Sequence, residues 1–175
     1  MPIDPLTDNL IHRINVGDSL TRTTARHPQR IAVVDGDRRI TYAELNAWVN
    51  RVANSLAARG YRAGDALALA SGNSVEFLVT YYACAKLGVV CVPLNLGWRP
   101  QEMTYVLRHS QARGLVVESQ LASVLERAVA EADEVCDIVI APGVDGREGP
   151  PSPPWEPIAF SALDAGDAAE PEHVV

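Results

Sequence analysis

The loop Asn95-Leu96-Gly97-Trp98-Arg99 is the stretch of this sequence that we single out as a candidate ligand site. It follows a short apolar run, Val89–Val92, which is long enough for a buried strand and too short for a helix. Pro100 can begin a helix directly after the loop, because its missing N–H would be unpaired in the first turn anyway. Open α/β sheets bind ligands at the carboxyl ends of their strands, where this loop would lie. These residues alone do not name a reaction.

Other chemical groups in the sequence form no recognisable catalytic or metal-binding pattern. Ser71-Gly72-Asn73 lacks the glycine spacing of a phosphate-binding loop, and we interpret it as a strand-to-helix turn. We interpret Glu131-Ala132-Asp133-Glu134 as the solvated end of a helix and not as a metal site. No histidine has a metal partner three or four residues further along; the four are His12, His27, His109 and His173. We therefore predict no catalytic residue and no metal ligand in this chain.

The single lysine, Lys86, and the three cysteines, Cys84, Cys91 and Cys136, are interpreted as structural residues. Lys86 falls near the end of a predicted helix, where a positive charge suits the helix dipole. The cysteine spacing fits no zinc site, and the odd number argues against a complete set of disulfides. Free cysteines in apolar runs behave as small apolar residues.

Charge and hydropathy exclude several classes of protein. The N-terminus lacks the basic and apolar regions of a secretory signal, and no window approaches the ~18 consecutive apolar residues of a membrane span. We therefore expect a cytoplasmic location and no transmembrane segment. The net charge is −7, and from residue 114 onward the chain holds 2 basic and 13 acidic residues. An acidic chain is a poor candidate for nucleic-acid binding, which needs a clustered basic surface.

Helices and strands must alternate to position the candidate loop, and they do so from Thr41 onward. Thr41-Tyr42-Ala43-Glu44 is a capping box that begins a helix, which Gly60 ends. Such alternation predicts parallel strands with helices on both faces of the sheet. The expected strands are 31–34, 38–41, 66–70, 89–92, one ending near 117, and 137–140. The expected helices are 17–26, 42–59, one capped by Asn73 and ending near Leu87, one beginning at Pro100, and 120–132.

We thus predict a doubly wound α/β fold with a mostly parallel sheet, a small N-terminal hairpin and a Pro-rich C-terminal extension. Asp35-Gly36 predicts the turn of the hairpin. The expected segments are residues 1–28 with a short helix, the α/β subdomain 29–140, and the acidic extension 141–175. The extension holds seven of the 12 prolines, so we expect it to be loop-like and partly polyproline.

Apolar spacing also predicts which helix faces are buried. Trp48 is expected to anchor the core from the first long helix. The next helix is expected to bury a stripe of Phe77, Tyr81 and Cys84. In the last helix the expected buried face holds Leu121, Val124, Leu125 and Ala128.

Four motifs in this order resemble the N-terminal segment of the adenylate-forming (ANL) superfamily. They are Ile40–Leu45 (ITYAEL), Gly72–Phe77 (GNSVEF), Ala85–Asn95 (AKLGVVCVPLN) and Pro100–Leu107. The similarity extends from about residue 17 to residue 140. Members include acyl-CoA synthetases, luciferase-type enzymes and the adenylation domains of peptide synthetases. The turn Trp98-Arg99-Pro100-Gln101-Glu102 is most similar to bacterial fatty-acyl-CoA ligases.

The resemblance implies an ATP-dependent acyl-CoA synthetase. In that family a fatty-acid carboxylate attacks the α-phosphate of ATP with Mg²⁺ present, and the CoA thiolate then displaces AMP from the acyl-adenylate. The phosphate-binding loop of the family follows a segment like Glu170–Val175, and this sequence holds no such loop. We therefore expect the chain to be the first part of a longer enzyme, inactive alone and unable to bind ATP, Mg²⁺ or CoA tightly.

The resemblance also implies a role for the candidate loop. In related ligases the turn after the P-x-N motif faces the CoA nucleotide, and a basic residue there can meet its phosphates. The corresponding residues here are Gly97, Trp98 and Arg99. The position that most often carries the basic group is glycine in this sequence, so Arg99 would have to substitute. Arg99 could equally cap the helix or face solvent, and Trp98 could pack instead of stacking on adenine.

Two other functions stay open at this point. An adenylation domain that loads a carrier protein instead of CoA shares the same early motifs. A non-enzymatic α/β module that self-associates as a homodimer is the third candidate, because a partial domain would expose apolar surface.

Overall fold

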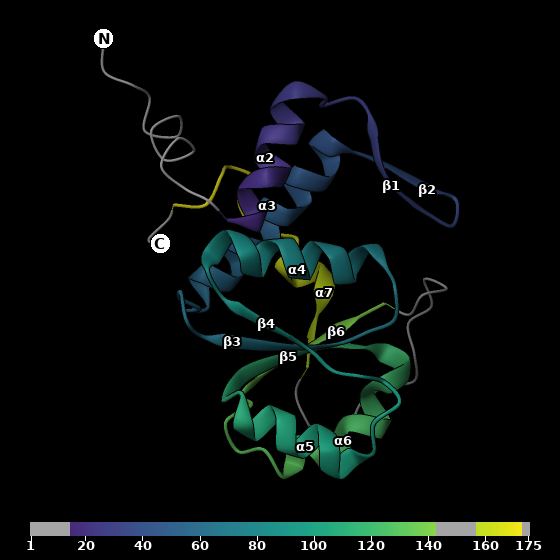
Figure 1. Ribbon diagram of the computed structural model, residues 1–175, viewed down its shortest axis with the longest axis vertical. Coiled ribbons are helices and arrows are strands. Elements are labelled where there is room, and N and C mark those ends of the chain that lie inside the picture. Colours follow the sequence, from purple (N-terminus) through teal and green to yellow (C-terminus); the bar gives the residue numbers. More distant parts are fainter. Residues whose placement is uncertain (1–14, 143–156, 173–175) are drawn as a thin grey trace.

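A parallel five-stranded sheet lies between two groups of helices in the computed structural model, which describes residues 15–142 and 157–172 (Figure 1). The strand order is β4-β3-β5-β6-β7, and each neighbouring pair is parallel. The predicted parallel sheet is therefore confirmed. Its strands are β3 (Ala66–Ala70), β4 (Val90–Pro93), β5 (Ala112–Glu118), β6 (Asp137–Ala141) and β7 (Ile158–Ala159).

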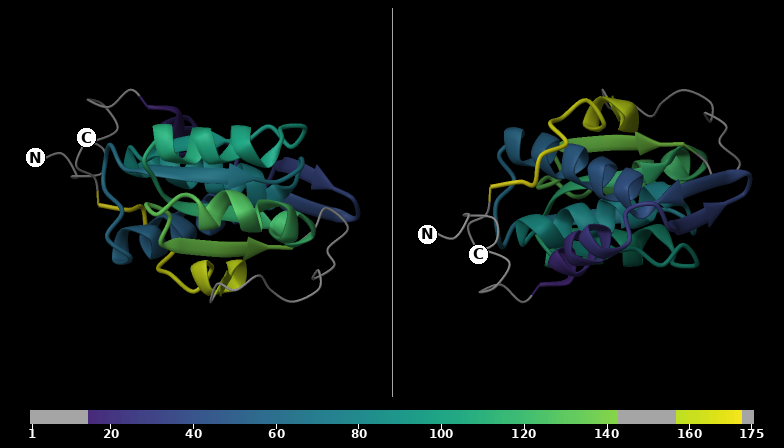
Figure 2. Two further views of the ribbon diagram at one scale, coloured as in Figure 1. Left: turned by 90° about the horizontal axis from the view of Figure 1, so that it is seen from below. Right: turned by 90° about the horizontal axis from the view of Figure 1, so that it is seen from above.

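Different helices cover the two faces of the sheet (Figures 1 and 2). On one face α3 and α4 pack together, with α2 against both. On the other face α5 and α6 pack together, and the 3-10 turn η1 precedes α6. The predicted doubly wound architecture is confirmed. The bounds are α2 (Val16–Arg26), α3 (Tyr42–Ala58), α4 (Val75–Leu87), α5 (Pro100–His109), η1 (Ser119–Leu121), α6 (Ala122–Ala130) and α7 (Phe160–Leu163).

Alternate residues of β3, which lies between β4 and β5, face the two cores. Leu67 and Leu69 belong to the core beneath α3 and α4, whereas Ala68 and Ala70 belong to the core above α5 and α6. Successive side chains of a strand point to opposite faces, so a strand covered on both sides is apolar at every position. This explains why β3 has no polar alternation.

The predicted hairpin is also confirmed, although its two-residue turn is Gly36-Asp37 and not Asp35-Gly36. β1 (Ile31–Asp35) and β2 (Arg38–Thr41) pair antiparallel and form a sheet of their own. The hairpin extends away from the central sheet beside the helices (Figure 1). The Arg38 guanidinium donates to the buried Glu76 carboxylate at 2.8 Å, which ties the hairpin to the first turn of α4.

Helix starts mostly follow local patterns in the sequence, and the start of α4 needs a correction. The predicted capping box is present, since Thr41 N donates to Glu44 Oε2 at 2.8 Å and Glu44 N donates to Thr41 Oγ1 at 3.2 Å. The cap predicted for α4 at Asn73 is wrong. Ser74 caps that helix instead, and its hydroxyl accepts from Phe77 N at 3.1 Å.

The buried stripe predicted for α4 is partly wrong. Tyr81 is 40% exposed and Phe77 is half buried, whereas Val79, Ala83 and Cys84 are fully buried. α4 packs against the sheet on one side and against α2 and α3 on the other. A helix that buries two faces is apolar nearly all round, so its sequence does not single out one stripe.

The start and the buried face predicted for α6 also need correction. Ser119 begins a 3-10 turn, and α6 itself begins at Ala122. Leu125 and Ala128 are buried as expected, but Val124 is 50% exposed. A 3-10 turn has about three residues per turn and not 3.6. It therefore changes which residues of the following helix face the core.

The C-terminal extension is not loop-like throughout, contrary to expectation. In its described part, β7 pairs with β6, and Phe160 and Leu163 of α7 are buried in the core. The Trp48 ring meets the Phe160 ring edge-on, with 6.3 Å between centroids. The extension thus supplies a strand and a helix that cover the core, and Trp48 packs there as predicted. Residues 143–156, with their proline cluster, lie outside the described residues.

Candidate functional site

The carboxyl ends of β3 and β5 form the topological switch point of the sheet, because the chain leaves these strands toward opposite faces. Open α/β sheets bind ligands in such crevices. Here the Gly72 N–H donates to the buried Glu118 carboxylate at 2.8 Å, and the Ser71 hydroxyl lies 3.4 Å from the same oxygen. The Glu118 carboxylate thus accepts the hydrogen bond of an amide that a phosphate-binding nest would need. This supports the interpretation of Ser71–Asn73 as a strand-to-helix turn.

The candidate loop lies one strand away, after β4 at the edge of the sheet. Asn95 Oδ1 accepts from Gly97 N at 2.9 Å, and the Asn95 carbonyl accepts from Trp98 N at 3.0 Å. Arg99 N donates to Glu102 Oε2 at 2.7 Å. The loop backbone is therefore held by short-range bonds and leads directly into α5.

The three predicted site residues come together at the start of α5. Gly97 and Arg99 are exposed, and Trp98 is half buried against the core between the sheet and α5. No side chain in the described part of the chain pairs with the Arg99 guanidinium. An open pocket of about 420 Å³ beside the loop is lined by Trp98, Gln101, Glu102, Tyr105 and Val106.

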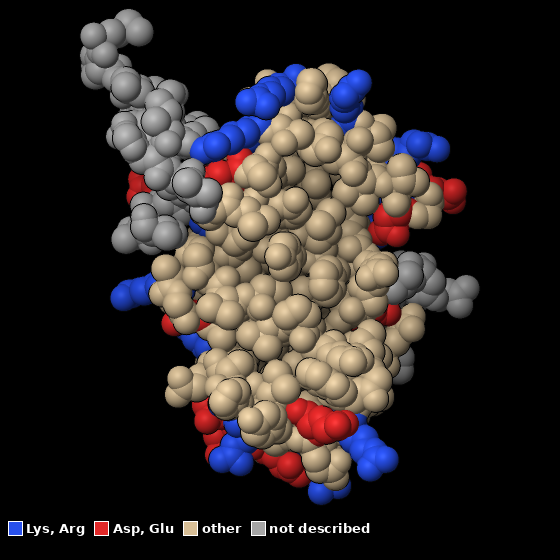
Figure 3. Space-filling view, in the orientation of Figure 1, with Lys and Arg blue, Asp and Glu red and all other residues tan. Residues whose placement is uncertain are grey.

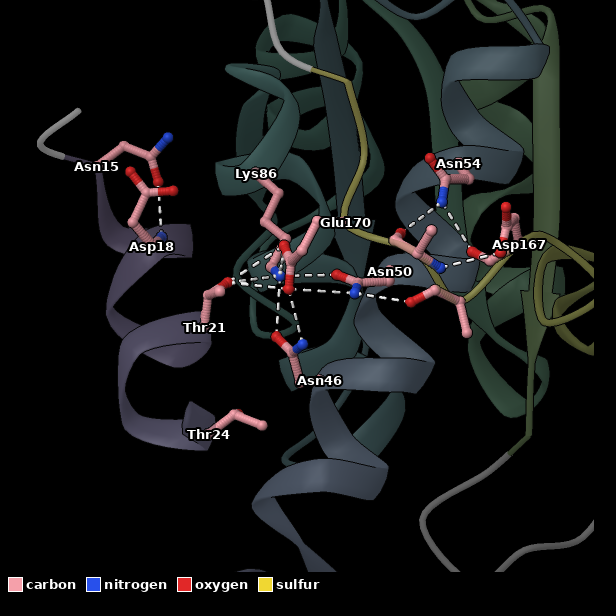
Figure 4. A network of polar contacts seen from close by, with 12 residues as sticks. Asn15, Asp18, Thr21, Thr24, Asn46, Asn50, Asn54, Lys86, Asp167 and Glu170 are labelled. Carbon is pink, nitrogen blue, oxygen red and sulfur yellow. Dashed lines mark hydrogen bonds and ion pairs between the residues drawn. The ribbon is translucent and has the colours of Figure 1, made fainter. Parts of the chain in front are cut away.

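A buried polar cluster around Lys86 is a feature that sequence reasoning missed (Figure 4). Lys86 is 1% exposed although it is a lysine. Its Nζ donates to oxygens on α2, on α3 and in the C-terminal extension. These are Thr21 Oγ1 and Asn46 Oδ1 at 2.8 Å, and Asn50 Oδ1 and Glu170 Oε2 at 2.6 Å. We call Thr21, Asn46, Asn50, Lys86 and Glu170 the lysine cluster.

The interpretation of Lys86 as a cation at a helix end is therefore incomplete. Lys86 does lie in the last turn of α4, but its ammonium is bound by side chains of other elements. The packing around its stem is tight, because a Cβ added to Gly17 would lie 2.7 Å from Lys86 Cγ. The missing Cβ of Gly17 is what lets α2 approach α4 this closely.

A row of asparagines on α3 holds the segment that carries Glu170. Asn46, Asn50 and Asn54 are four residues apart, so they share one face of the helix. We call residues 164–172 the strap; it is drawn in yellow beside α3 in Figure 2, right. The bonds to the strap are Asn46 Nδ2 to Glu170 Oε1 (2.8 Å), Asn50 Nδ2 to the Ala168 carbonyl (2.9 Å), and Asn54 Nδ2 to the carbonyls of Asp167 (2.7 Å) and Ala169 (3.0 Å).

Opposing effects set the pKa of the Glu170 carboxyl. Burial alone would raise this pKa. The positive charge of Lys86 and the hydrogen bonds from Asn46, Lys86 and Asn50 outweigh burial and lower the pKa below its ordinary value of 4.5. Glu170 is therefore ionised at neutral pH, and the cluster contains an ion pair.

Other chemistry is sparse in the described residues. They hold no group of three or more His, Cys, Asp or Glu side chains that could bind a metal ion. Glu131, in the acidic stretch after α6, pairs with Arg127 at 3.0 Å. No helix of residues 15–142 and 157–172 combines the length and the apolarity that a membrane span requires. His12 and His173 lie outside the described residues.

Surface charge does not form a single basic patch on the face shown in Figure 3. There the charged side chains of both signs gather around the rim, and the middle of the face is largely uncharged. Nucleic-acid binding would need clustered basic side chains.

Comparison with known proteins identifies the family. The family described as "AMP-binding enzyme" matches residues 20–174. This chain belongs to the AMP-binding enzyme family. The match covers most of the chain, from within α2 to beyond the strap.

Several AMP-binding relatives are CoA ligases. Long-chain-fatty-acid–CoA ligase FadD13 of Mycobacterium tuberculosis is 37% identical over 121 residues, covering 68% of this chain and 24% of that protein. 3-Hydroxybenzoate–CoA ligase of Aromatoleum sp. is 28% identical and covers 91% of this chain and 33% of that protein. A linear gramicidin synthase of Brevibacillus parabrevis is 32% identical over 115 residues, covering 66% of this chain and 1% of that protein. The chain thus spans a quarter to a third of the length of these CoA ligases.

Solved structures agree with this assignment. The N-terminal domain of FACL13 from Mycobacterium tuberculosis matches with a TM-score of 0.77 at 30% identity, covering 91% of this chain and 38% of that chain. Coronafacic acid ligase from Pectobacterium brasiliense has the same fold, with a TM-score of 0.81 at 20% identity, covering 93% of this chain and 31% of that chain. The resemblance to the N-terminal part of adenylate-forming acyl-CoA ligases is confirmed.

Proposed function

We propose that this chain is the N-terminal part of an ATP-dependent fatty-acyl-CoA synthetase. The observation that carries the proposal is the 37% identity with a long-chain-fatty-acid–CoA ligase over 121 residues. The parent enzyme would join a fatty acid to the α-phosphate of ATP, release pyrophosphate, and transfer the acyl group from AMP to the CoA thiol. We assign no metal ligand among the described residues, which hold no group of three or more His, Cys, Asp or Glu side chains that could bind a metal ion.

For the 175-residue chain itself we propose a scaffold role without catalysis, in the cytoplasm. The test compares this chain with the proposed full-length parent enzyme, using ATP, Mg²⁺, palmitate and CoA. We expect pyrophosphate and palmitoyl-CoA from the longer enzyme and neither product above background from this chain. Clear turnover by the 175-residue chain would contradict the scaffold role. A longer enzyme inactive on every fatty acid would contradict the ligase assignment.

We further propose that Arg99 contacts a phosphate of CoA, with Gly97 giving access and Trp98 packing beside it. Arg99 is exposed, and its guanidinium has no partner among the described side chains. It also adjoins the N-terminus of α5, where the helix dipole favours anions. In the full enzyme, Arg99→Ala should raise the KM for CoA about 5-fold and leave kcat unchanged, because only ground-state binding is lost.

The matched control for Arg99 is Arg108→Ala, which removes an exposed arginine from the opposite end of α5. It should leave the KM for CoA unaltered. An Arg99→Ala enzyme with the same CoA KM as the wild type would reject the CoA contact.

A second candidate function is an adenylation domain that loads a carrier protein. The 32% identity with the linear gramicidin synthase over 115 residues favours it. The two functions differ in acceptor and substrate. Pyrophosphate exchange that depends on an amino acid, with transfer to a phosphopantetheine carrier and not to free CoA, would select this candidate over the ligase.

We propose that residues 1–28, 29–140 and 141–175 are three segments of this scaffold. The packing of α2 on α3 and α4 supports a role for the first segment in covering the helices. The bonds of the strap to α3 support a role for the third segment as a tie. Limited proteolysis tests the second boundary, and cleavage first within β6 would oppose it.

A further inference from the structure

The lysine cluster surrounds one carboxylate with donors from three helices. The Lys86 ammonium lies 2.6 Å from Glu170 Oε2. The amides of Asn46 and Asn50 lie 2.8 Å and 3.2 Å from Glu170 Oε1, and the Thr21 hydroxyl lies 3.2 Å from both oxygens. An ammonium with neutral N–H and O–H donors is the set that a carboxylate needs, because its oxygens only accept hydrogen bonds.

The donors also hold one another, in addition to their bonds with the strap. Lys86 also donates to the side-chain oxygens of Thr21, Asn46 and Asn50, so α2, α3 and α4 orient one another's polar groups. Lys86, Asn50 and Thr21 are 1%, 2% and 9% exposed. The pocket is therefore built into the packed helices, and Glu170 enters it from a separate segment.

We propose that Thr21, Asn46, Asn50 and Lys86 form a carboxylate-binding pocket, which Glu170 fills in cis to latch the strap onto the helices. This inference goes beyond the proposed function and does not depend on it. The pocket would accept a small free carboxylate when the side chain of Glu170 is removed.

Access and shape both favour a small carboxylate as the replacement ligand. The Glu170 side chain keeps 20% of its surface exposed, so solvent reaches the mouth of the pocket. Glu170→Ala removes the side chain beyond Cβ, and the lost atoms correspond to those of an acetate ion. The emptied pocket would hold a buried ammonium without its counter-charge, which is strongly unfavourable.

Acetate rescue of the Glu170→Ala chain tests the pocket directly. We expect this substitution to lower Tm by about 10 °C in potassium chloride, because one partner of a buried ion pair is lost. Potassium acetate at about 0.5 M should then raise Tm by about 3 °C more than potassium chloride of equal ionic strength, since a ligand of the native state stabilises it by mass action. If Glu170→Ala is unfolded in chloride, the same titration should restore helical circular dichroism in acetate only.

Three controls separate a specific pocket from a general salt effect. The wild-type chain should show no difference between acetate and chloride, because Glu170 already fills the pocket. Glu172→Ala removes an exposed carboxylate two residues away and should show neither destabilisation nor rescue. Lys86→Met combined with Glu170→Ala should lose the acetate-specific rise. Equal Tm values in acetate and chloride for Glu170→Ala, or an acetate rise that survives Lys86→Met, would overturn the proposal.

Discussion

The candidate loop at the start of α5 and the lysine cluster differ in how far their contacts reach along the chain. Bonds within the loop join residues two or three positions apart. Bonds within the cluster join residues 36 to 149 positions apart. The loop presents an exposed arginine, whereas the cluster buries the single lysine. The exposed region is thus open to a ligand, and the buried one ties separate elements together.

This difference separates residues that can change function from residues that hold the fold. Arg99 can be replaced without breaking any bond between described side chains. Lys86 cannot be replaced without leaving Glu170, Asn46 and Asn50 short of a partner. Matched substitutions in the two regions should therefore give opposite results for stability and for ligand binding.

The largest expected effect is that of Lys86→Met. It should lower the free energy of unfolding by about 3–5 kcal/mol, because it leaves a partly buried carboxylate without its cation. Arg99→Met, the matched change in the loop, should alter stability by less than about 0.5 kcal/mol. Urea unfolding of the two variants measures this difference in unfolding free energy. Similar losses of unfolding free energy in both variants would contradict the prediction.

A smaller loss is expected when an alanine methyl group is introduced beside the lysine stem. In Gly17→Ala the new Cβ would lie within 3 Å of side-chain and backbone atoms of Lys86, so α2 must move and stability should fall by about 1–3 kcal/mol. The loop control is Gly97→Ala, where the nearest atom is Asn95 Oδ1 at 3.3 Å. Thermal unfolding should show a clear loss only for Gly17→Ala; a tolerated Gly17→Ala would mean that the approach of α2 to α4 is looser than described.

Asn54→Ala should cost about 1 kcal/mol, because it deletes the bonds to two carbonyls of the strap. Its distinguishing readout is local, namely faster amide hydrogen exchange in residues 164–172. Asn95→Ala removes a bond within the loop and should leave exchange in the strap unchanged. Equal protection of the strap in Asn54→Ala and wild type would show that the asparagine row is not needed.

Acidification below pH 4.5, the ordinary pKa of a glutamate carboxyl, should lower the free energy of unfolding by the smallest amount. The pKa of Glu170 is lowered in the folded chain, so its contribution is complete above 4.5 and is lost as the pH falls through the folded value. The dependence of unfolding free energy on pH in this acid range should be flatter in Glu170→Gln than in the wild type. Identical slopes would show that Glu170 does not change protonation on unfolding.

Local structure could be predicted from the sequence because its causes are local. The capping box at Thr41, the hairpin turn, which lies at Gly36-Asp37 one residue later than expected, and the helix start at Pro100 each depend on a few adjacent residues. The parallel sheet followed from the alternation of apolar runs. The start of α4 was misplaced by one residue because Asn73 and Ser74 are both competent caps, and only the path of the preceding turn decides between them.

The lysine cluster could not be predicted because its two charges are 84 residues apart and both fall in misleading contexts. Lys86 sits where a cation suits a helix end, and Glu170 sits in an acidic, Pro-rich extension. Two weak indications were present: the single lysine on a mostly apolar helix, and asparagines at 46, 50 and 54 with helical spacing. Water could satisfy three amides on a helix face, so their spacing did not require a protein partner; here the strap satisfies them.

A double-mutant cycle between Lys86→Met and Glu170→Gln, measured by urea unfolding, tests most directly whether the ion pair latches the strap to the helices. We predict a coupling free energy of at least about 1.5 kcal/mol, because each single change leaves the other partner buried and unpaired. Additive losses, with a coupling below about 0.5 kcal/mol, would contradict the latch.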